Sequence, residues 1–209
     1  RLFTVNDEFV TSANHIEPNA TQINFNHSLV GTGHVKFGSK SRPIFGASYN
    51  GSNYNGILKV AGGTGAAGVK LVSNVSDNGT FLKAGGVISV VNQGATITIN
   101  GANTLKGSIQ TGNNTVGLVI NKNQSAVGLI TMGTGGINLS GAQAVTSVAF
   151  ADNSGSNWGS GTIAITGFAD NEISFGSDAN GLTAQQLTKI TLNGSAVSIN
   201  GSGQLAAVG

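Results

Sequence analysis

The side chains best suited to acid–base or metal chemistry are three histidines near the start of the chain. His15, His27 and His34 are 12 and 7 positions apart, which is not the spacing of a compact metal site. The Gly-x-Ser-x-Gly sequence that presents a nucleophilic serine in many hydrolases does not occur. We therefore interpret the histidines as scattered surface residues and predict no catalytic residue among them.

Carboxylates are few, and one group of them is close in sequence. Asp170, Glu172 and Asp178 stand out among the 8 acidic residues. Oxygens that converge in a short loop suit calcium, and a carboxylate pair at a defined separation suits glycoside hydrolysis. A solvated turn is the favoured interpretation. We predict no cofactor or metal site, with calcium as the alternative.

A glycine-rich segment resembles the fingerprint of dinucleotide-binding proteins. Gly63, Gly65 and Gly68 have the Gly-x-Gly-x-x-Gly spacing and follow a strand-like run. That fingerprint needs a helix whose N-terminus meets the pyrophosphate. Residues 69–76 instead alternate as a strand would, so the sequence favours a glycine-rich β-turn.

The composition excludes several partners. Only 9% of the residues are charged, and the net charge of +2 includes no basic run. Nucleic-acid binding needs clustered Lys and Arg, so we exclude it. Apolar runs stay short of the ~18 residues of a membrane helix, so no membrane span is expected. There are no cysteines, and because Arg1 is the first residue we expect a processed or trimmed chain.

Alternation with a period of two dominates the chain. Its clearest examples are residues 96–100, 162–166 and 196–200, and Asn-Gly pairs separate many such segments. This pattern predicts an all-β fold. A β-solenoid (parallel β-helix-like) is favoured, because glycine suits its corners and stacked asparagine amides form ladders. Residues 115–120 are also echoed by residues 125–130. A β-sandwich with hairpins at the Asn-Gly turns is the alternative.

Two departures from this pattern are expected. One short helix is predicted over residues 182–190, with Thr183 placed to cap its start. The histidines, the prolines and most of the aromatic residues precede residue 60. We therefore predict an N-terminal capping or docking segment over residues 1–60 and a Gly/Asn-rich β body over residues 61–209, with one continuous domain as the alternative.

Residues 158–192 resemble the closing unit of bacterial secreted proteins built from autotransporter-associated β-strand repeats, many of which carry a PEP-CTERM sorting tail. The shared features are Trp158, the strand-like Gly161-Thr162-Ile163-Ala164-Ile165, then Ile173-Ser174-Phe175-Gly176, and Gly181-Leu182-Thr183 followed by spaced apolar anchors. No proline-acidic sorting motif follows Ile199. The resemblance implies export and an extracellular β-rich architecture, and it transfers no catalytic residues.

The favoured function is an extracellular or cell-surface structural or adhesive protein, and not an enzyme. Low charge with abundant Val, Ile and Thr leaves strand edges able to pair with another chain. The expected partner is a second copy, in a homo-oligomer or filament such as a fibre, matrix or sheath. The apolar terminal segments are the candidates for strand exchange, at Leu2, Phe3, Val5, Leu205 and Val208.

The alternative function is a carbohydrate- or host-surface-binding module. Trp158, Tyr49 and Tyr54 would then be stacking platforms for surface glycans. Ten Asn-x-Ser/Thr sequons are compatible both with glycosylation and with ordinary turn chemistry. The sequence leaves these two interpretations of the sequons equal.

Overall fold

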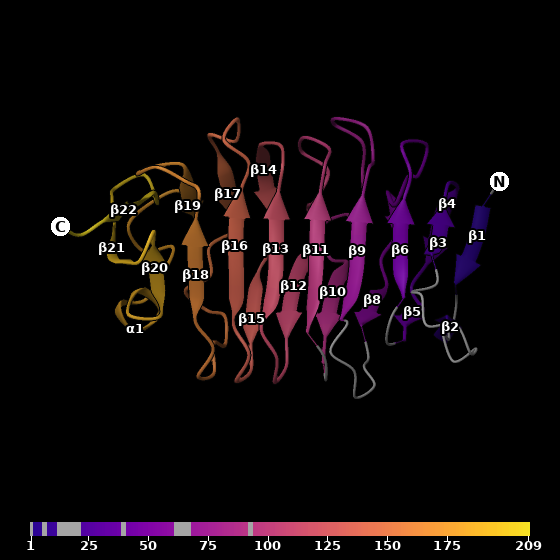
Figure 1. Ribbon diagram of the computed structural model, residues 1–209, viewed down its shortest axis with the longest axis horizontal. Helices are drawn as coiled ribbons and strands as arrows, with labels where there is room; N and C mark the ends of the chain where they lie inside the picture. Colours follow the sequence, from indigo (N-terminus) through magenta and orange to yellow (C-terminus); the bar gives the residue numbers. More distant parts are fainter. Residues whose placement is uncertain (1, 6–7, 12–21, 39–40, 61–67, 92–93) are drawn as a thin grey trace.

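The chain winds into a β-solenoid of about seven turns. The computed structural model describes residues 2–5, 8–11, 22–38, 41–60, 68–91 and 94–209. Short strands of successive turns stack side by side along one axis, with the two ends of the chain at opposite ends of the stack (Figure 1). The favoured fold prediction is confirmed, and the β-sandwich alternative is wrong.

One side of the solenoid is a ten-stranded sheet. Most of its strands are parallel, and each pairs with the strand one turn later. These parallel strands are β3 (Gln22–Phe25), β6 (Arg42–Phe45), β9 (Val69–Ser73), β11 (Ala95–Ile99), β13 (Val116–Ile120), β16 (Ile137–Gly141), β18 (Ile163–Thr166) and β20 (Ile190–Leu192). The last two strands, β21 (Ser195–Ile199) and β22 (Leu205–Ala207), are antiparallel.

The second side is a six-stranded parallel sheet. Its strands are β2 (Glu8–Thr11), β5 (His34–Phe37), β8 (Ile57–Val60), β10 (Val87–Val90), β12 (Ser108–Thr111) and β15 (Ile130–Met132). The remaining strands form two three-stranded parallel sheets, one nearer each end of the chain. The first has β1 (Leu2–Val5), β4 (Ser28–Gly31) and β7 (Asn53–Tyr54), and the second has β14 (Gln124–Val127), β17 (Val148–Phe150) and β19 (Ile173–Phe175).

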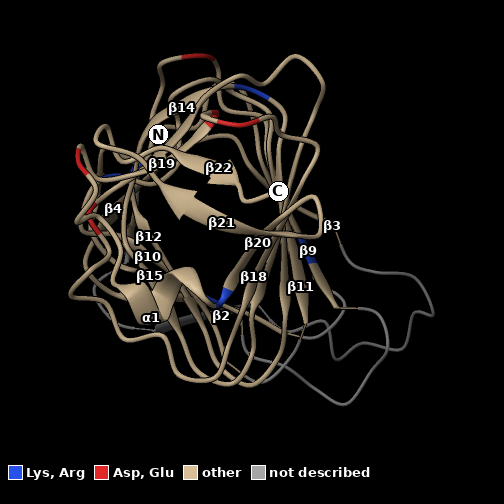
Figure 2. Cartoon of the chain, turned by 90° about the vertical axis from the view of Figure 1, so that its left-hand side faces the viewer, with Lys and Arg blue, Asp and Glu red and all other residues tan. Residues whose placement is uncertain are grey.

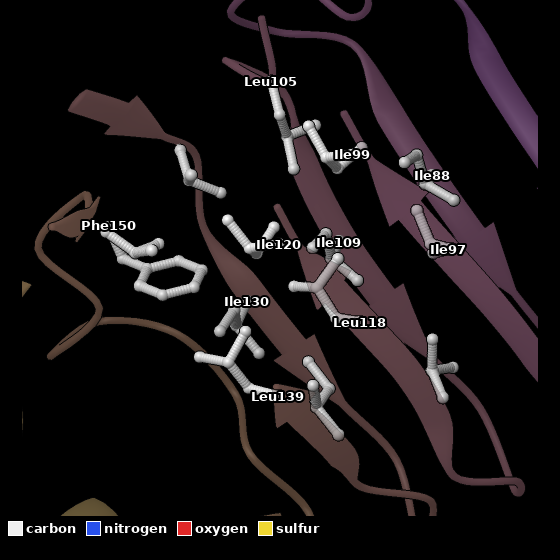
Figure 3. Packing of buried hydrophobic residues seen from close by; sticks show 14 of the residues in the cluster. Ile88, Ile97, Ile99, Leu105, Ile109, Leu118, Ile120, Ile130, Leu139 and Phe150 are labelled. Atoms are coloured by element: carbon white, nitrogen blue, oxygen red, sulfur yellow. The ribbon is translucent and has the colours of Figure 1, made fainter. Parts of the chain in front are cut away.

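The core runs along the axis of the stack. Side chains alternate across a strand, so every second residue points inward. Ile97, Leu118 and Leu139 lie in register on neighbouring strands, and each is at most 1% exposed (Figure 3). One continuous apolar cluster extends from Leu29 to Leu205. The turns before and after residue 60 therefore share one core.

Aromatic rings fill this core towards both ends. Phe25 stacks on Phe45 with ring centroids 4.7 Å apart, and Phe37 meets Phe45 edge-on at 6.4 Å. Near the other end Phe150 stacks on Phe175 at 4.9 Å. Such ring pairs stabilise a core beyond the area they bury.

The predicted helix is present but shorter than expected. It is α1 (Ala184–Leu187), and Thr183 and Gln186 form a capping box at its start. The side chain of Thr183 accepts a hydrogen bond from the backbone of Gln186 at 3.1 Å. In the described parts of the chain, the helical structure includes no segment with the length and apolarity of a membrane span.

Candidate functional site

The histidines form no recognisable site. His27 follows β3 and is exposed, and His34 lies in β5 with partial exposure. His15 falls outside the described residues. Within the described ranges, no group of three His, Asp or Glu side chains is placed to hold a metal ion.

The carboxylates singled out in the sequence make local structural contacts. Asp170 Oδ1 accepts a hydrogen bond from the backbone N–H of Ala207 at 2.8 Å. Glu172 Oε2 accepts one from the backbone N–H of Ala169 at 2.7 Å. Asp178 accepts one from the backbone two residues further on, also at 2.7 Å. Asp170 thereby ties the end of the chain to the solenoid.

The glycine-rich motif stands between two strands in the sequence. Residues 61–67 are outside the described residues, but β8 precedes them and β9 follows Gly68 directly. A side chain at Gly68 would place its Cβ 2.2 Å from the backbone oxygen of Gly94 in the next turn. The motif is therefore followed by a paired strand, and not by the helix that a phosphate site requires.

The three aromatic residues predicted as stacking platforms are buried. Trp158, Tyr49 and Tyr54 are 5%, 2% and 0% exposed. Trp158 Nε1 donates a hydrogen bond to the backbone oxygen of Ile130 at 2.9 Å, and the Tyr54 hydroxyl donates one to Gly33 at 2.8 Å. This prediction is wrong, because sugar stacking needs an exposed ring face while burial of the rings stabilises the core.

A shallow open groove of about 540 Å³ lies along the β14–β17–β19 side. Its charged lining residues are Lys106, Asp152 and Asp178. Hydrogen bonds from the side chain and backbone of Ser154 lower the pKa of Asp152. The aromatic ring in the lining, Phe150, is only 3% exposed. The groove therefore offers a few charges and small side chains, which single out no ligand.

All three sides of the solenoid are closed at the C-terminal end. On the ten-stranded side, β21 pairs antiparallel with β20. On the side of β19, Gln204 forms an antiparallel bridge with Ser174. On the third side α1 covers the end of the stack, and Lys189 Nζ donates hydrogen bonds to the backbone oxygens of Trp158 and Gly159 (Figure 2). We call α1 with Lys189, β21 and β22 the C-terminal cap.

Further contacts fix this cap to the preceding turn. Gln186 is 4% exposed, and its Nε2 donates hydrogen bonds to the backbone oxygens of Asn153 and Ser156 at 2.7 and 3.1 Å. Leu205, the first residue of β22, is fully buried, whereas Val208 beyond the strand is 51% exposed. The C-terminal segment that was expected to be free for strand exchange is thus anchored at Leu205, because the cap needs it to cover the core.

The N-terminal end is different. The candidates Leu2, Phe3 and Val5 lie in β1, which pairs in parallel with β4. Strands β1, β2 and β3 each stand last in their sheet, and the described residues place no strand against their outer sides. We call these three strands the N-terminal edge.

Sequence reasoning missed the residues that build the C-terminal cap. Lys189 and Gln186 contact backbone groups that lie 30 to 33 residues earlier in the chain. No local pattern encodes such a pairing. The Thr183-x-x-Gln186 capping box was the available signal, and it indicated only the start of the helix.

A scan against protein-family models and searches of curated proteins and of solved structures found no match to this chain.

Proposed function

We propose that this chain is an extracellular structural or adhesive surface protein whose copies associate by β-strand pairing. The observation that carries the proposal is the stack of parallel strands around one continuous apolar core. The chain has few charges, and strand edges without charges are able to pair with a further chain.

The rest of the molecule supports a mechanical role. A stack of parallel strands around one core is a stiff rod that extends by repetition. Its polar side chains are engaged in backbone contacts and amide ladders, such as the one from Asn74 through Asn100 to Asn121. Placement outside the cell is supported by the resemblance of residues 158–192 to secreted repeat proteins.

Self-association is tested by sedimentation velocity of the purified chain over a wide range of concentrations, with negative-stain microscopy of the same samples. We expect mass to increase with concentration. A monomer at every concentration would contradict the proposal. Surface placement is tested separately, because protease added to intact cells that produce the protein should degrade it while a cytosolic marker stays intact.

A further inference from the structure

We propose that a polar pocket beside α1 binds a sugar acid at the end of a glycan chain, meaning one terminal sugar ring that carries a carboxylate. The pocket lies between residues 154–159 and residues 183–189, which include α1. This inference goes beyond the proposed function, because it requires no association between copies. The two proposals can therefore fail independently.

The pocket has the size of one sugar ring. Its volume is about 280 Å³, which is roughly the space of nine water molecules. Gln186 is the most polar buried residue of the lining and joins the two walls, because its Nε2 donates hydrogen bonds to the backbone oxygens of Asn153 and Ser156 at 2.7 and 3.1 Å. The walls are thus held in place before any ligand arrives.

Lys189 gives the pocket its charge. It is the one charged residue of the lining, and its Nζ donates hydrogen bonds to the backbone oxygens of Trp158 and Gly159. These two bonds fix the ammonium and leave one of its three N–H donors for a ligand. Asp152 is outside the lining, and its Oδ1 accepts hydrogen bonds from the hydroxyl and N–H of Ser154 at 2.7 and 2.8 Å. The pocket therefore favours an anionic group.

Three further polar side chains of the lining are unused by the fold. Ser156, Asn157 and Gln185 line the pocket, and their side chains make no hydrogen bond to any residue that the structure describes. The amides of Gln124 and Asn153 contrast with them, because each is buried and uses both of its ends. Hydrogen-bonding groups thus gather in this pocket without a structural need for them.

The types of these side chains match sugar hydroxyls. An Asn or Gln amide offers both donors and an acceptor, and a hydroxyl is likewise donor and acceptor, so the two can pair in either direction. A fully ionised phosphate or sulfate offers only acceptors and would leave the amide oxygens unpaired. A carboxylate on the same ring would form a charge-assisted bond with Lys189. One cation among amides and hydroxyls therefore suits a sugar acid.

Recognition here needs no stacking on an aromatic ring. Trp158 is in the lining but only 5% exposed, so it presents no open ring face. The side chains of Asn157, Thr183 and Gln185 are exposed, so the pocket is open to solvent on their side. A ring bound against Lys189 could continue through this opening into a longer glycan.

Titration of the nitrogen-15-labelled chain, followed by nuclear magnetic resonance, tests the ligand. The probe is methyl glucuronide, in which the methyl group stands for the rest of a glycan. Methyl glucoside keeps the ring without the carboxylate, and acetate keeps only the carboxylate. We expect a dissociation constant on the order of 1 mM for the glucuronide and binding at least about fivefold weaker for both controls.

The resonances that move locate the site within the chain. We expect the side-chain amide signals of Asn157 and Gln185 to shift. Those of Asn138 and Gln143, which are exposed amides outside the lining, should stay in place. No shift at 157 and 185 with about 20 mM glucuronide would overturn the proposal and leave the proposed self-association untouched.

The other ligands decide between chemistries. Equal binding of methyl glucoside would overturn the role of the carboxylate, and equal binding of acetate would overturn the role of the ring. Free glucuronate that binds while its methyl glycoside does not would overturn the glycan as the source of the ligand.

Two matched pairs of variants test the contacts. Asn157→Ala and Gln185→Ala each remove an amide that the fold does not use, so we expect unchanged thermal unfolding and affinity for the glucuronide about threefold to tenfold lower. Asn138→Ala and Gln143→Ala are the controls and should bind as the natural chain does. Equal effects of all four substitutions would contradict the site.

Lys189→Gln separates charge recognition from a structural role. We expect it to remove the preference for the glucuronide over the glucoside while glucoside binding persists; equal weakening of both would overturn the carboxylate contact. Added salt tests the same contact in the unchanged chain, even where the variant loosens the cap. Salt should weaken binding of the glucuronide and not of the glucoside. Glucuronide binding that is independent of salt would overturn the pairing with Lys189.

Discussion

At the scale of single residues, the polar side chains of this solenoid mostly satisfy its backbone. Gln124 is 1% exposed and uses both ends of its amide. Its Oε1 accepts hydrogen bonds from the N–H groups of Thr104 and Leu105 at 3.1 Å, and its Nε2 donates to Gly101 at 2.8 Å and to Lys122 at 3.0 Å. The amide thus replaces strand pairing at an irregular corner of the solenoid.

The two buried tyrosines should respond differently to loss of the hydroxyl. The Tyr54 hydroxyl lies 2.8 Å from the backbone oxygen of Gly33 and 3.1 Å from that of Ile57, whereas the Tyr49 hydroxyl is buried without a hydrogen-bond partner among the described residues. We expect Tyr54→Phe to reduce the free energy of unfolding by about 1–2 kcal/mol and Tyr49→Phe to leave it unchanged or raise it. Urea unfolding measures both, and equal losses would contradict this account.

Tyr54 should also make stability depend on alkaline pH. Burial raises the pKa of Tyr54 to about 12, from the ordinary value near 10. Between these values the unfolded chain ionises its tyrosine while the folded chain keeps it protonated, so unfolding becomes more favourable as pH rises. We expect the free energy of unfolding to fall between about pH 10 and 12 and to fall less steeply in Tyr54→Phe. Identical slopes in urea titrations would refute the assignment.

The glycines of two Asn-Gly pairs should differ in their tolerance of a side chain. Gly101 follows Asn100, and a Cβ there would lie 1.9 Å from the backbone oxygen of Val75. Gly201 follows Asn200, and a Cβ there would meet nothing within 4 Å. We expect Gly101→Ala to cost about 2–4 kcal/mol and Gly201→Ala to change stability by less than about 0.5 kcal/mol. Chemical denaturation of both variants checks this, and a mild Gly101→Ala would contradict the close approach.

At the scale of elements, ladders of asparagine side chains link successive turns. Asn100 Nδ2 donates to Asn74 Oδ1 at 2.6 Å, and Asn121 Nδ2 donates to Asn100 Oδ1 at 2.7 Å. The expected stacking of amides in the solenoid is thereby confirmed. A second row joins Asn103 to Asn78 at 3.0 Å. These ladders hold neighbouring corners together where strand pairing has ended.

The position of an asparagine within a ladder should determine its contribution. Asn100→Ala removes two side-chain hydrogen bonds, and Asn74→Ala removes one at the end of the same row. At about 1 kcal/mol per bond, we expect the central substitution to cost about twice as much as the terminal one. Equilibrium unfolding in urea compares the two variants directly. If both variants lose the same free energy of unfolding, the second hydrogen bond of Asn100 adds nothing to stability.

At the scale of the whole molecule, a cap covers the C-terminal end of the stack. Each turn contacts mainly its neighbours, so the stability of a turn depends on what lies on both sides of it. The C-terminal turn is covered by β21, β22 and α1, whereas the N-terminal edge has strands on one side only within the described residues.

Backbone protection should reflect the C-terminal cap. We expect slow hydrogen exchange at Asn193 and Val208, whose N–H groups donate to Ile165 and Ala196 at 2.8 Å. Fast exchange at both positions would contradict the closure of this end of the stack by the cap.

Much of the fold could be predicted because alternation and turn chemistry are local properties. Period-two patterning established an all-β chain, glycine and asparagine favoured a solenoid, and Thr183 indicated the helix start. The pairing of the strands was harder to predict from the sequence. Residues 115–120 are echoed ten positions later in the sequence, but Val116 pairs with Ile137, a full turn away. Strand neighbours are set by the length of each turn, which depends on corners that have no fixed sequence.

Identical local signals also produced different structures. Asn193-Gly194 and Asn200-Gly201 join antiparallel strands in the C-terminal cap, whereas Asn100-Gly101 forms a corner between strands of two different sheets. The dipeptide permits a tight turn, but the neighbouring turn of the solenoid decides what the chain does after it.

The sequence by itself therefore determined the strands, the single short helix and the scarcity of charge, because these depend on residues a few positions apart. Only the tertiary structure decided that the three aromatic candidates are buried and that the C-terminal segment closes the stack. Burial and edge pairing depend on contacts made across whole turns of the solenoid, and no local pattern of residues specifies which end will be covered.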